Sequence, residues 1–451
     1  MTLSRRTLLK GAGSLPLLTV HFPMPALAQS GSAAATPPIL FVHGNGDHAA
    51  LWITTLWRME SNGVARDRMF AINFTDPLAR NDDAIAQPNR SSTEDQRREL
   101  GDAIKALKEK TGASRVALVG NSRGGNAIRN YVKNGGAADV SHAVLCGTPN
   151  HGAYAWDENL GNEFNGRGPF LRGLNDGDSE VTPGTAFLTL RSDGLDKYAQ
   201  ADGRFVGKPG TPTNVTTEGP ALKGATNLVL GPVDHRETAY SPRAFREIYK
   251  FIAGREPERL EIVAEEEVTL SGLVTGTPGG VQTNRPVEDA LVEVFRVVPG
   301  TGERIGNAIH GGNTAADGRW GPATVDPSWP LEIMLTSPGL TTTHFYRSPF
   351  PRSSDIVHLR AARALTPADT GAVVIMSRPR GYFGLPRDVV LLDGKEPADV
   401  KAGVPTDSAT TLKLPAEDIG RGVACLFNEE RIVARSWPAA ETRIAVAELT
   451  Y

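Results

Sequence analysis

Cysteine is almost absent from this sequence: only Cys146 and Cys425 occur among 451 residues. The two lie far apart and fall in different predicted domains, so they do not form the disulfide framework of a small secreted protein. Each is expected to be a small, buried apolar side chain. Stability must then come from apolar cores, and a chain of this length predicts two or three domains.

The sequence also lacks a strong net charge and a long apolar run. Its formal net charge is -3, with 40% hydrophobic and 22% charged residues. This balance is not that of a disordered chain or of a nucleic-acid-binding protein. No stretch reaches the ~20 apolar residues that a membrane-spanning helix needs, so no transmembrane span is expected. No pair of histidines has the spacing of a zinc hydrolase, so no metal site is expected either.

The N-terminus has the pattern of an export signal. Arg5 and Arg6 precede a modestly apolar, leucine-rich run, and the segment ends in the small-x-small pattern of residues 26–28. This arrangement predicts a twin-arginine signal peptide over residues 1–28 and a periplasmic or secreted protein. A short membrane anchor is the less favoured alternative, because prolines interrupt the run.

The segment from residue 29 to 256 is predicted to be an α/β domain. Short apolar runs such as ILFVHG, VALVG and HAVLCG alternate with amphipathic stretches, and this alternation predicts a doubly wound, mostly parallel sheet covered by helices on both faces. Helical spacing predicts one helix between Ser92 and Gly112 and another between Ser241 and Gly254.

After residue 257 the pattern changes to short β-prone runs separated by Gly, Pro, Asn and Asp. Such spacing predicts one or two small β-sandwich-like modules, which we place at residues 257–362 and 363–451. In the first, PVEDALVEVFRV and TAADGRWG resemble segments of transthyretin-like or carboxypeptidase-regulatory-like modules.

The stretch VALVGNSRGG places Ser122 in a G-x-S-x-G pattern between a predicted buried strand and a predicted helix. A serine at such a strand-to-helix turn exposes its hydroxyl at the edge of the sheet, and the flanking Gly120 and Gly124 leave room for a sharp turn. We therefore expect Ser122 to be a nucleophile. The alternative is a serine that only caps the helix.

A serine nucleophile needs a base, and the base needs an orienting acid. When a serine nucleophile lies at such a turn of a parallel α/β sheet, the chain order of the three groups is Ser, acid, His. This order favours His235 as the base and places the acid after the AFLTLRS run. Asp196 is the favoured acid and Asp193 the alternate. His151 precedes both carboxylates, so we interpret it as a structural or rim residue.

The HGNG stretch after the first predicted strand is a candidate oxyanion loop. The backbone N–H of Asn45 and that of Arg123, the residue after Ser122, are the expected donors. The remaining histidines of the domain, His43, His48 and His142, are expected to serve structure.

In their order along residues 37–254, the segments VHGNG, VGNSRGG, GTPNHG, FLRGLNDGDSEVTPG, LTLRSDGLD and VDHRETAYSPRAF resemble those of the microbial lipases and carboxylesterases of the α/β-hydrolase superfamily. Some of these relatives carry a C-terminal β domain. Two features depart from the family: Arg123 stands where a small or apolar residue is common, and an extra residue in SDGLD leaves the acid open.

The resemblance implies hydrolysis of carboxylic esters, especially acyl lipids, with no metal or organic cofactor. Ser122 would attack the ester, His235 would transfer the proton, and the acid would hold the imidazole. The expected partner is an ester or lipid substrate, met in solution or at a lipid or polymer interface. The sequence carries no signal for an oligomeric state.

Two other functions fit the same sequence. One is a polyester depolymerase of the polyhydroxyalkanoate type, with the β modules docked on the polymer. The other is an inactive binding protein that recognises a surface or carbohydrate through its β modules. Residues 154–184, rich in Gly and Asn and dotted with aromatics, are either a lid that supplies the acyl-binding wall or an ordinary packed insertion.

Overall fold

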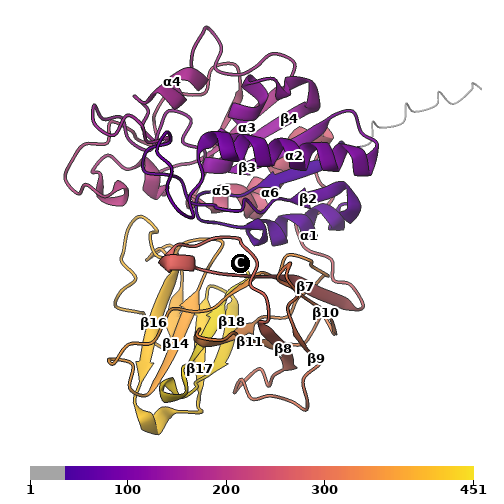
Figure 1. Ribbon diagram of the computed structural model, residues 1–451, viewed down its shortest axis with the longest axis vertical. Helices are drawn as coiled ribbons and strands as arrows, with labels where there is room; N and C mark the ends of the chain where they lie inside the picture. The colour runs from indigo at the N-terminus through magenta and orange to yellow at the C-terminus, as the bar shows by residue number, and fades with distance from the viewer. Residues whose placement is uncertain (1–35) are drawn as a thin grey trace, which may run out of the picture. The chain divides into compact units, whose positions relative to one another are not determined.

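A six-stranded parallel sheet forms the framework of the first half of the chain in the computed structural model, which describes residues 36–451 (Figure 1). Its strands are β1 (Ile39–Val42), β2 (Met69–Ala71), β3 (Val116–Asn121), β4 (Val140–Cys146), β5 (Ala186–Ser192) and β6 (Thr226–Leu230). They lie in the order β2-β1-β3-β4-β5-β6, and each neighbouring pair is parallel. The loops that follow β1, β3, β5 and β6 therefore leave from the same edge of the sheet.

Helices cover both faces of this sheet. They are α1 (Ile53–Ser61), α2 (Thr93–Thr111), α3 (Arg123–Lys133), α4 (Pro169–Leu174), α5 (Glu237–Tyr240) and α6 (Pro242–Ala253). Because side chains alternate along a strand, Leu40 and Leu118 pack with α2 and α3, whereas Phe41 and Val119 pack with α1 and α6. The predicted doubly wound α/β class is confirmed.

Both helices predicted from helical spacing are present, and their ends follow the capping chemistry. Ser92 and Asp95 form a capping box at the start of α2, and Gly112 ends it in the left-handed region at φ 66°. The hydroxyl of Ser241 caps α6 by accepting from the N–H of Ala244, and Gly254 ends that helix at φ 68°.

The second half of the chain is built mainly from strands, with a few single-turn 3-10 helices between them. A seven-stranded sheet has the order β16-β14-β19-β12-β11-β8-β9. Its strands are β8 (Leu291–Arg296), β9 (His310–Asn313), β11 (Leu331–Thr336), β12 (Thr342–Arg347), β14 (Ala372–Ser377), β16 (Ala409–Leu414) and β19 (Arg443–Glu448). The β-rich class predicted for this half is confirmed.

Two three-stranded sheets complete this half, in the orders β10-β7-β13 and β15-β17-β18. Their strands are β7 (Val268–Thr275), β10 (Arg319–Val325), β13 (Leu359–Arg360), β15 (Val390–Leu392), β17 (Gly422–Phe427) and β18 (Glu430–Arg435). Pairing crosses the predicted module boundary at residue 362, because β12 runs parallel to β19 with Phe345 opposite Val446. The module boundaries stay a prediction.

Residues 36–451 cluster as one unit, and contacts join its two halves. The indole N–H of Trp57 on α1 donates to the carbonyl of Ser353 at 3.0 Å, and its ring meets that of Phe350 edge-on at 6.0 Å between centroids. One apolar core runs from the sheet through α1 and α6 into β7 and β11. The β-rich half is thus part of the core that supports the parallel sheet.

Residues 1–35, and with them the predicted signal peptide, lie outside the described residues, so export stays a prediction. Among residues 36–451, no helix combines the length and apolar character needed to cross a bilayer. Cys146 and Cys425 are both buried and unpaired, and burial raises the pKa of each thiol. Both are the inert, buried side chains that the sequence predicted.

Three histidines lie where the two halves meet: His43 and His358 are buried, and His48 is half-buried. His43 accepts a hydrogen bond from the backbone N–H of Phe74 at 3.1 Å, and the rings of His48 and His358 lie 5.3 Å apart. Burial lowers the pKa of His43 to about 4 and that of His358 to about 3, and it also holds the pKa of His48 well below its ordinary value. All three are therefore neutral when folded at pH 7.

This burial predicts a loss of stability in mild acid. Below pH 6.5 the unfolded chain protonates these histidines while the folded chain leaves them neutral, so the free energy of unfolding falls as the pH drops toward 4. Each histidine contributes up to about 1.4 kcal/mol per pH unit. Urea unfolding between pH 7 and 5, above the range where most carboxylates titrate, checks this, and a flat profile would contradict it.

Candidate active site

Ser122 occupies a strained turn at the end of β3. Its backbone has φ 54° and ψ -122°, and α3 begins at the next residue. A Cβ on Gly120 would lie 2.7 Å from Ile128, and one on Gly124 would lie 2.5 Å from the carbonyl of His43, so only glycine fits on either side. The side chain of Ser122 makes no capping hydrogen bond, so the helix-cap alternative is wrong.

Ser122 and His235 line the same cavity, whose volume is about 290 Å³. His235 lies in the loop between β6 and α5 and is 3% exposed. The other side chains that line the cavity come mostly from loops: Asn45, Asp47, Asn121, Pro149, Ala153, Tyr154, Asn162, Phe164, Tyr198, Phe205, Val206, Arg236 and Tyr382. The structure thus brings the predicted nucleophile and the predicted base to one site.

Asp196 is the carboxylate that meets His235. Its Oδ2 lies 2.8 Å from Nδ1 of His235, and its Oδ1 accepts a hydrogen bond from the N–H of Tyr198 at 2.8 Å. Asp193 is exposed and accepts from the N–H of Gly194 at 2.9 Å. With Nδ1 paired to a carboxylate, Nε2 is the ring nitrogen available to a hydroxyl.

The other predicted residues take different places. His151 pairs with Glu180, with Nε2 3.0 Å from Oε1, and does not line the Ser122 cavity. Gly44 lies against Ser122, since a Cβ on it would be 3.1 Å from that of Ser122, and Asn45 lines the cavity beside it. The side-chain oxygen of Asn45 accepts from the N–H of Ala79 at 2.8 Å and so fixes this loop.

The side chain of Arg123 does not line the Ser122 cavity, and it is fully buried. Its Nε and Nη2 each donate to a carboxylate oxygen of Glu163 at 2.7 Å, and Nη1 donates to the hydroxyl of Ser91 at 2.9 Å. Glu163 belongs to the insertion at residues 154–184. The buried ion pair of Arg123 and Glu163 therefore ties this insertion to the start of α3.

Several residues of the cavity were not predicted from the sequence. Tyr382 comes from the β-rich half, and the guanidinium of Arg236 lies 3.2 Å from Asp47 and 5.1 Å from the centre of the Tyr382 ring. Tyr198 meets the His235 ring edge-on at 4.7 Å. Adjacency to His235 could have drawn attention to Arg236, but no local pattern points to Tyr382.

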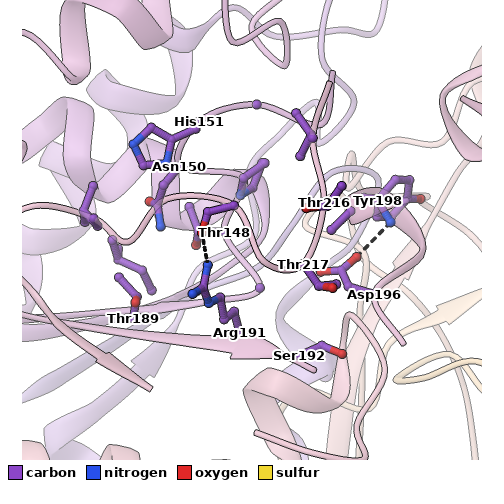
Figure 2. A pocket seen from close by; sticks show the side chains of 18 of the residues that line it. Thr148, Asn150, His151, Thr189, Arg191, Ser192, Asp196, Tyr198, Thr216 and Thr217 are labelled. Carbon is purple, nitrogen blue, oxygen red and sulfur yellow. Dashed lines mark hydrogen bonds between the residues drawn. The ribbon is translucent and has the colours of Figure 1, made fainter. Parts of the chain in front are cut away.

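A second cavity of about 300 Å³ is lined by both Asp196 and His235. Figure 2 shows Asp196 and Tyr198 among its side chains. Tyr198 and His235 line both cavities. Its wall includes four threonines, and Arg191, which also lines it, donates to the carbonyl of Gly219 at 2.6 Å. The pair of Asp196 and His235 thus lies between the Ser122 cavity and a second, more apolar one.

Within residues 36–451, no group of three or more His, Cys, Asp or Glu side chains is placed to hold a metal ion.

Comparisons with known proteins find two family models in this chain. Residues 36–149 match the model described as lipase (class 2), and residues 266–364 match the model described as lipase C-terminal domain.

Three solved structures illustrate the likeness to other proteins. Mature lipase BlEst2 from Bacillus licheniformis is 20% identical over 49% of this chain and 93% of its own, with a TM-score of 0.35. The lin2722 gene product of Listeria innocua is 16% identical over 50% of this chain and 97% of its own, with a TM-score of 0.33. Phospholipase PlaB from Legionella pneumophila is 13% identical over 73% of this chain and 95% of its own, also with a TM-score of 0.33.

Proposed function

We propose that this carboxylic ester hydrolase, which carries a class 2 lipase domain and a lipase C-terminal domain, cleaves acyl esters through Ser122, His235 and Asp196. The observation that carries the proposal is the 2.8 Å pairing of His235 with Asp196, in a cavity that His235 shares with a serine held at positive φ. A nucleophile, a base and an orienting acid are the three groups that acyl transfer to serine needs.

In the proposed reaction, the hydroxyl of Ser122 attacks the ester carbonyl while Nε2 of His235 takes its proton. Asp196 holds the N–H at Nδ1 and stabilises the imidazolium that forms. The backbone N–H groups of Asn45 and Arg123 donate to the oxyanion, and each such donor is worth about 2.7 to 4 kcal/mol in the transition state.

Collapse of the tetrahedral intermediate breaks the ester bond, and the leaving alcohol receives the proton from His235. Water then attacks the acyl group on Ser122 with His235 again acting as base. The acid is released and Ser122 regains its proton. The two half-reactions use the same three side chains.

One part of the Ser122 cavity wall is apolar and another is charged, and this difference suggests how an ester substrate lies in it. Tyr154 and Phe164 of the insertion, together with Phe205 and Val206, supply apolar surface, whereas Asp47 and Arg236 supply charge. We assign the acyl chain to the apolar residues and the leaving alcohol to the charged side. An acyl chain on one wall and a polar alcohol on the other is the division expected for a lipid ester.

A fluorophosphonate probe tests the proposed nucleophile, because such probes phosphonylate an activated serine. Labelling of the wild-type protein, mapped by mass spectrometry to the peptide that holds Ser122, is the expected result. A protein that hydrolyses esters but is labelled at another serine would refute the proposed triad. A protein that is neither labelled nor active would instead favour the binding-protein alternative.

Replacing Phe164 with alanine is expected to lower kcat/KM about 10-fold for p-nitrophenyl decanoate and little for p-nitrophenyl acetate. The ring lines the cavity, and burying apolar surface of this size is worth about 1.5 kcal/mol or more. Leu160→Ala is the control, since Leu160 lies on the same insertion but is 44% exposed and lines no part of this cavity. An unchanged preference in Phe164→Ala would remove the insertion from the acyl wall.

A further inference from the structure

The loop that carries His235 is folded around the carboxylate of the residue before it. Asp234 is fully buried, and its Oδ1 accepts from the N–H groups of Arg236 at 2.8 Å and Glu237 at 2.9 Å. These two bonds close the turn on the C-terminal side of His235. The position of the imidazole therefore depends on where Asp234 is held.

The other oxygen of Asp234 is held from the β-rich half. Its Oδ2 accepts from Nη1 of Arg378 at 3.0 Å and from the backbone N–H of Tyr382 at 2.9 Å. The side chain of Arg378 is 4% exposed, and its Nη2 donates to Glu237 at 2.6 Å. The guanidinium of Arg378 thus donates to two carboxylates, Asp234 before His235 in the sequence and Glu237 after it.

The loop that carries Asp196 is held from the same segment of the chain. Lys197, the next residue, donates to the carbonyl of Thr406 at 2.9 Å, and its ammonium lies 3.8 Å from the centre of the Tyr382 ring. Tyr382 itself lines the Ser122 cavity. Both loops that meet in the 2.8 Å pair of His235 and Asp196 are therefore anchored to residues 378–406.

We propose that Arg378 is a positioning residue for catalysis: acting through Asp234, it sets the imidazole of His235, so that the β-rich half completes the active site. This inference rests on the proposed triad. A guanidinium suits the task because its planar fork can bind two carboxylates in fixed directions, which a flexible ammonium does not do. Small displacements of a catalytic group lower the rate steeply, by about 10²-fold for ~1 Å.

The test measures hydrolysis of p-nitrophenyl acetate by full-length Arg378→Ala. We expect kcat to fall about 10²-fold with KM little changed, and added guanidinium chloride at low millimolar concentration to restore part of the rate. Sodium chloride at equal concentration should restore none. Arg421→Ala is the matched control, since Arg421 pairs with Asp393 in the same half, is 34% exposed and touches neither loop. Its rate should equal that of the wild type.

A merely structural role would lower stability without these kinetic signs. Arg378→Lys keeps the charge, so it is the variant to use if Arg378→Ala does not fold; it should again lower kcat rather than raise KM. A folded Arg378 variant with wild-type kcat would overturn the inference, as would a loss that guanidinium does not relieve. Fluorophosphonate labelling separates the proposed triad from the proposed role of Arg378. A wild-type protein that is not labelled at Ser122 refutes the triad. Equal labelling rates at Ser122 in the wild type and the Arg378 variant refute only the role of Arg378.

Discussion

Replacing Ser122 with alanine is expected to lower kcat for ester hydrolysis by about 10⁶-fold, the scale of losses seen when a serine hydrolase loses its nucleophile. The change removes only the oxygen that is proposed to attack the ester. The cavity, the proposed oxyanion donors at Asn45 and Arg123, and the pair of His235 and Asp196 all remain. Initial rates on p-nitrophenyl acetate and butyrate, measured with enough protein to exceed the background, check this result.

Stability should hardly change in Ser122→Ala, so the loss cannot be ascribed to unfolding. The hydroxyl caps no helix, and the positive φ of 54° strains serine and alanine alike. We expect the free energy of unfolding to stay within about 0.5 kcal/mol of the wild type. Ser141→Ala is the control, since the hydroxyl of Ser141 in β4 bonds only to the carbonyl of Val116 and to Nδ1 of His142 and does not line the cavity. Activity retained in Ser122→Ala would mean that another group carries the chemistry.

Asp196→Asn is expected to lower kcat about 10⁴-fold, because the amide can donate to Nδ1 of His235 and then holds the imidazole in the wrong tautomer. Asp193→Asn should leave the rate within about 2-fold, since an exposed side chain that does not contact the site contributes little. The two variants make the same chemical change three positions apart in one loop. Equal effects would show that the loop matters as a whole and that neither carboxylate orients the histidine.

Asp193 and Asp196 also show which parts of the site could be predicted from the sequence and which could not. The turn at Ser122 was predictable because strand, glycine spacing and helix are local features of a few neighbouring residues. The prediction of His235 as the base rested on chain order and on the strand that precedes it. The choice between Asp193 and Asp196 depends on how the loop after β5 turns, and the short 3-10 helix at Lys197–Ala199 that sets this turn has no clear sequence pattern.

Long-range partners were beyond any local pattern. Arg123 and Glu163 form a buried ion pair across 40 residues of sequence, and a charged residue in a sequence is ordinarily interpreted as a surface residue. Arg378 reaches Asp234 across 144 residues. Such pairs form only when the chain folds, so the sequence around one residue does not reveal its distant partner.

The place of β19 in the seven-stranded sheet limits when the chain can finish folding. This strand is the last in the sequence, yet it lies between β14 and β12 and runs parallel to both. While the ribosome still holds Arg443–Glu448, the two halves of that sheet have no backbone to join them. The seven-stranded sheet can therefore close only after Arg443–Glu448 has left the ribosome, well after β12 and β14 have been synthesised.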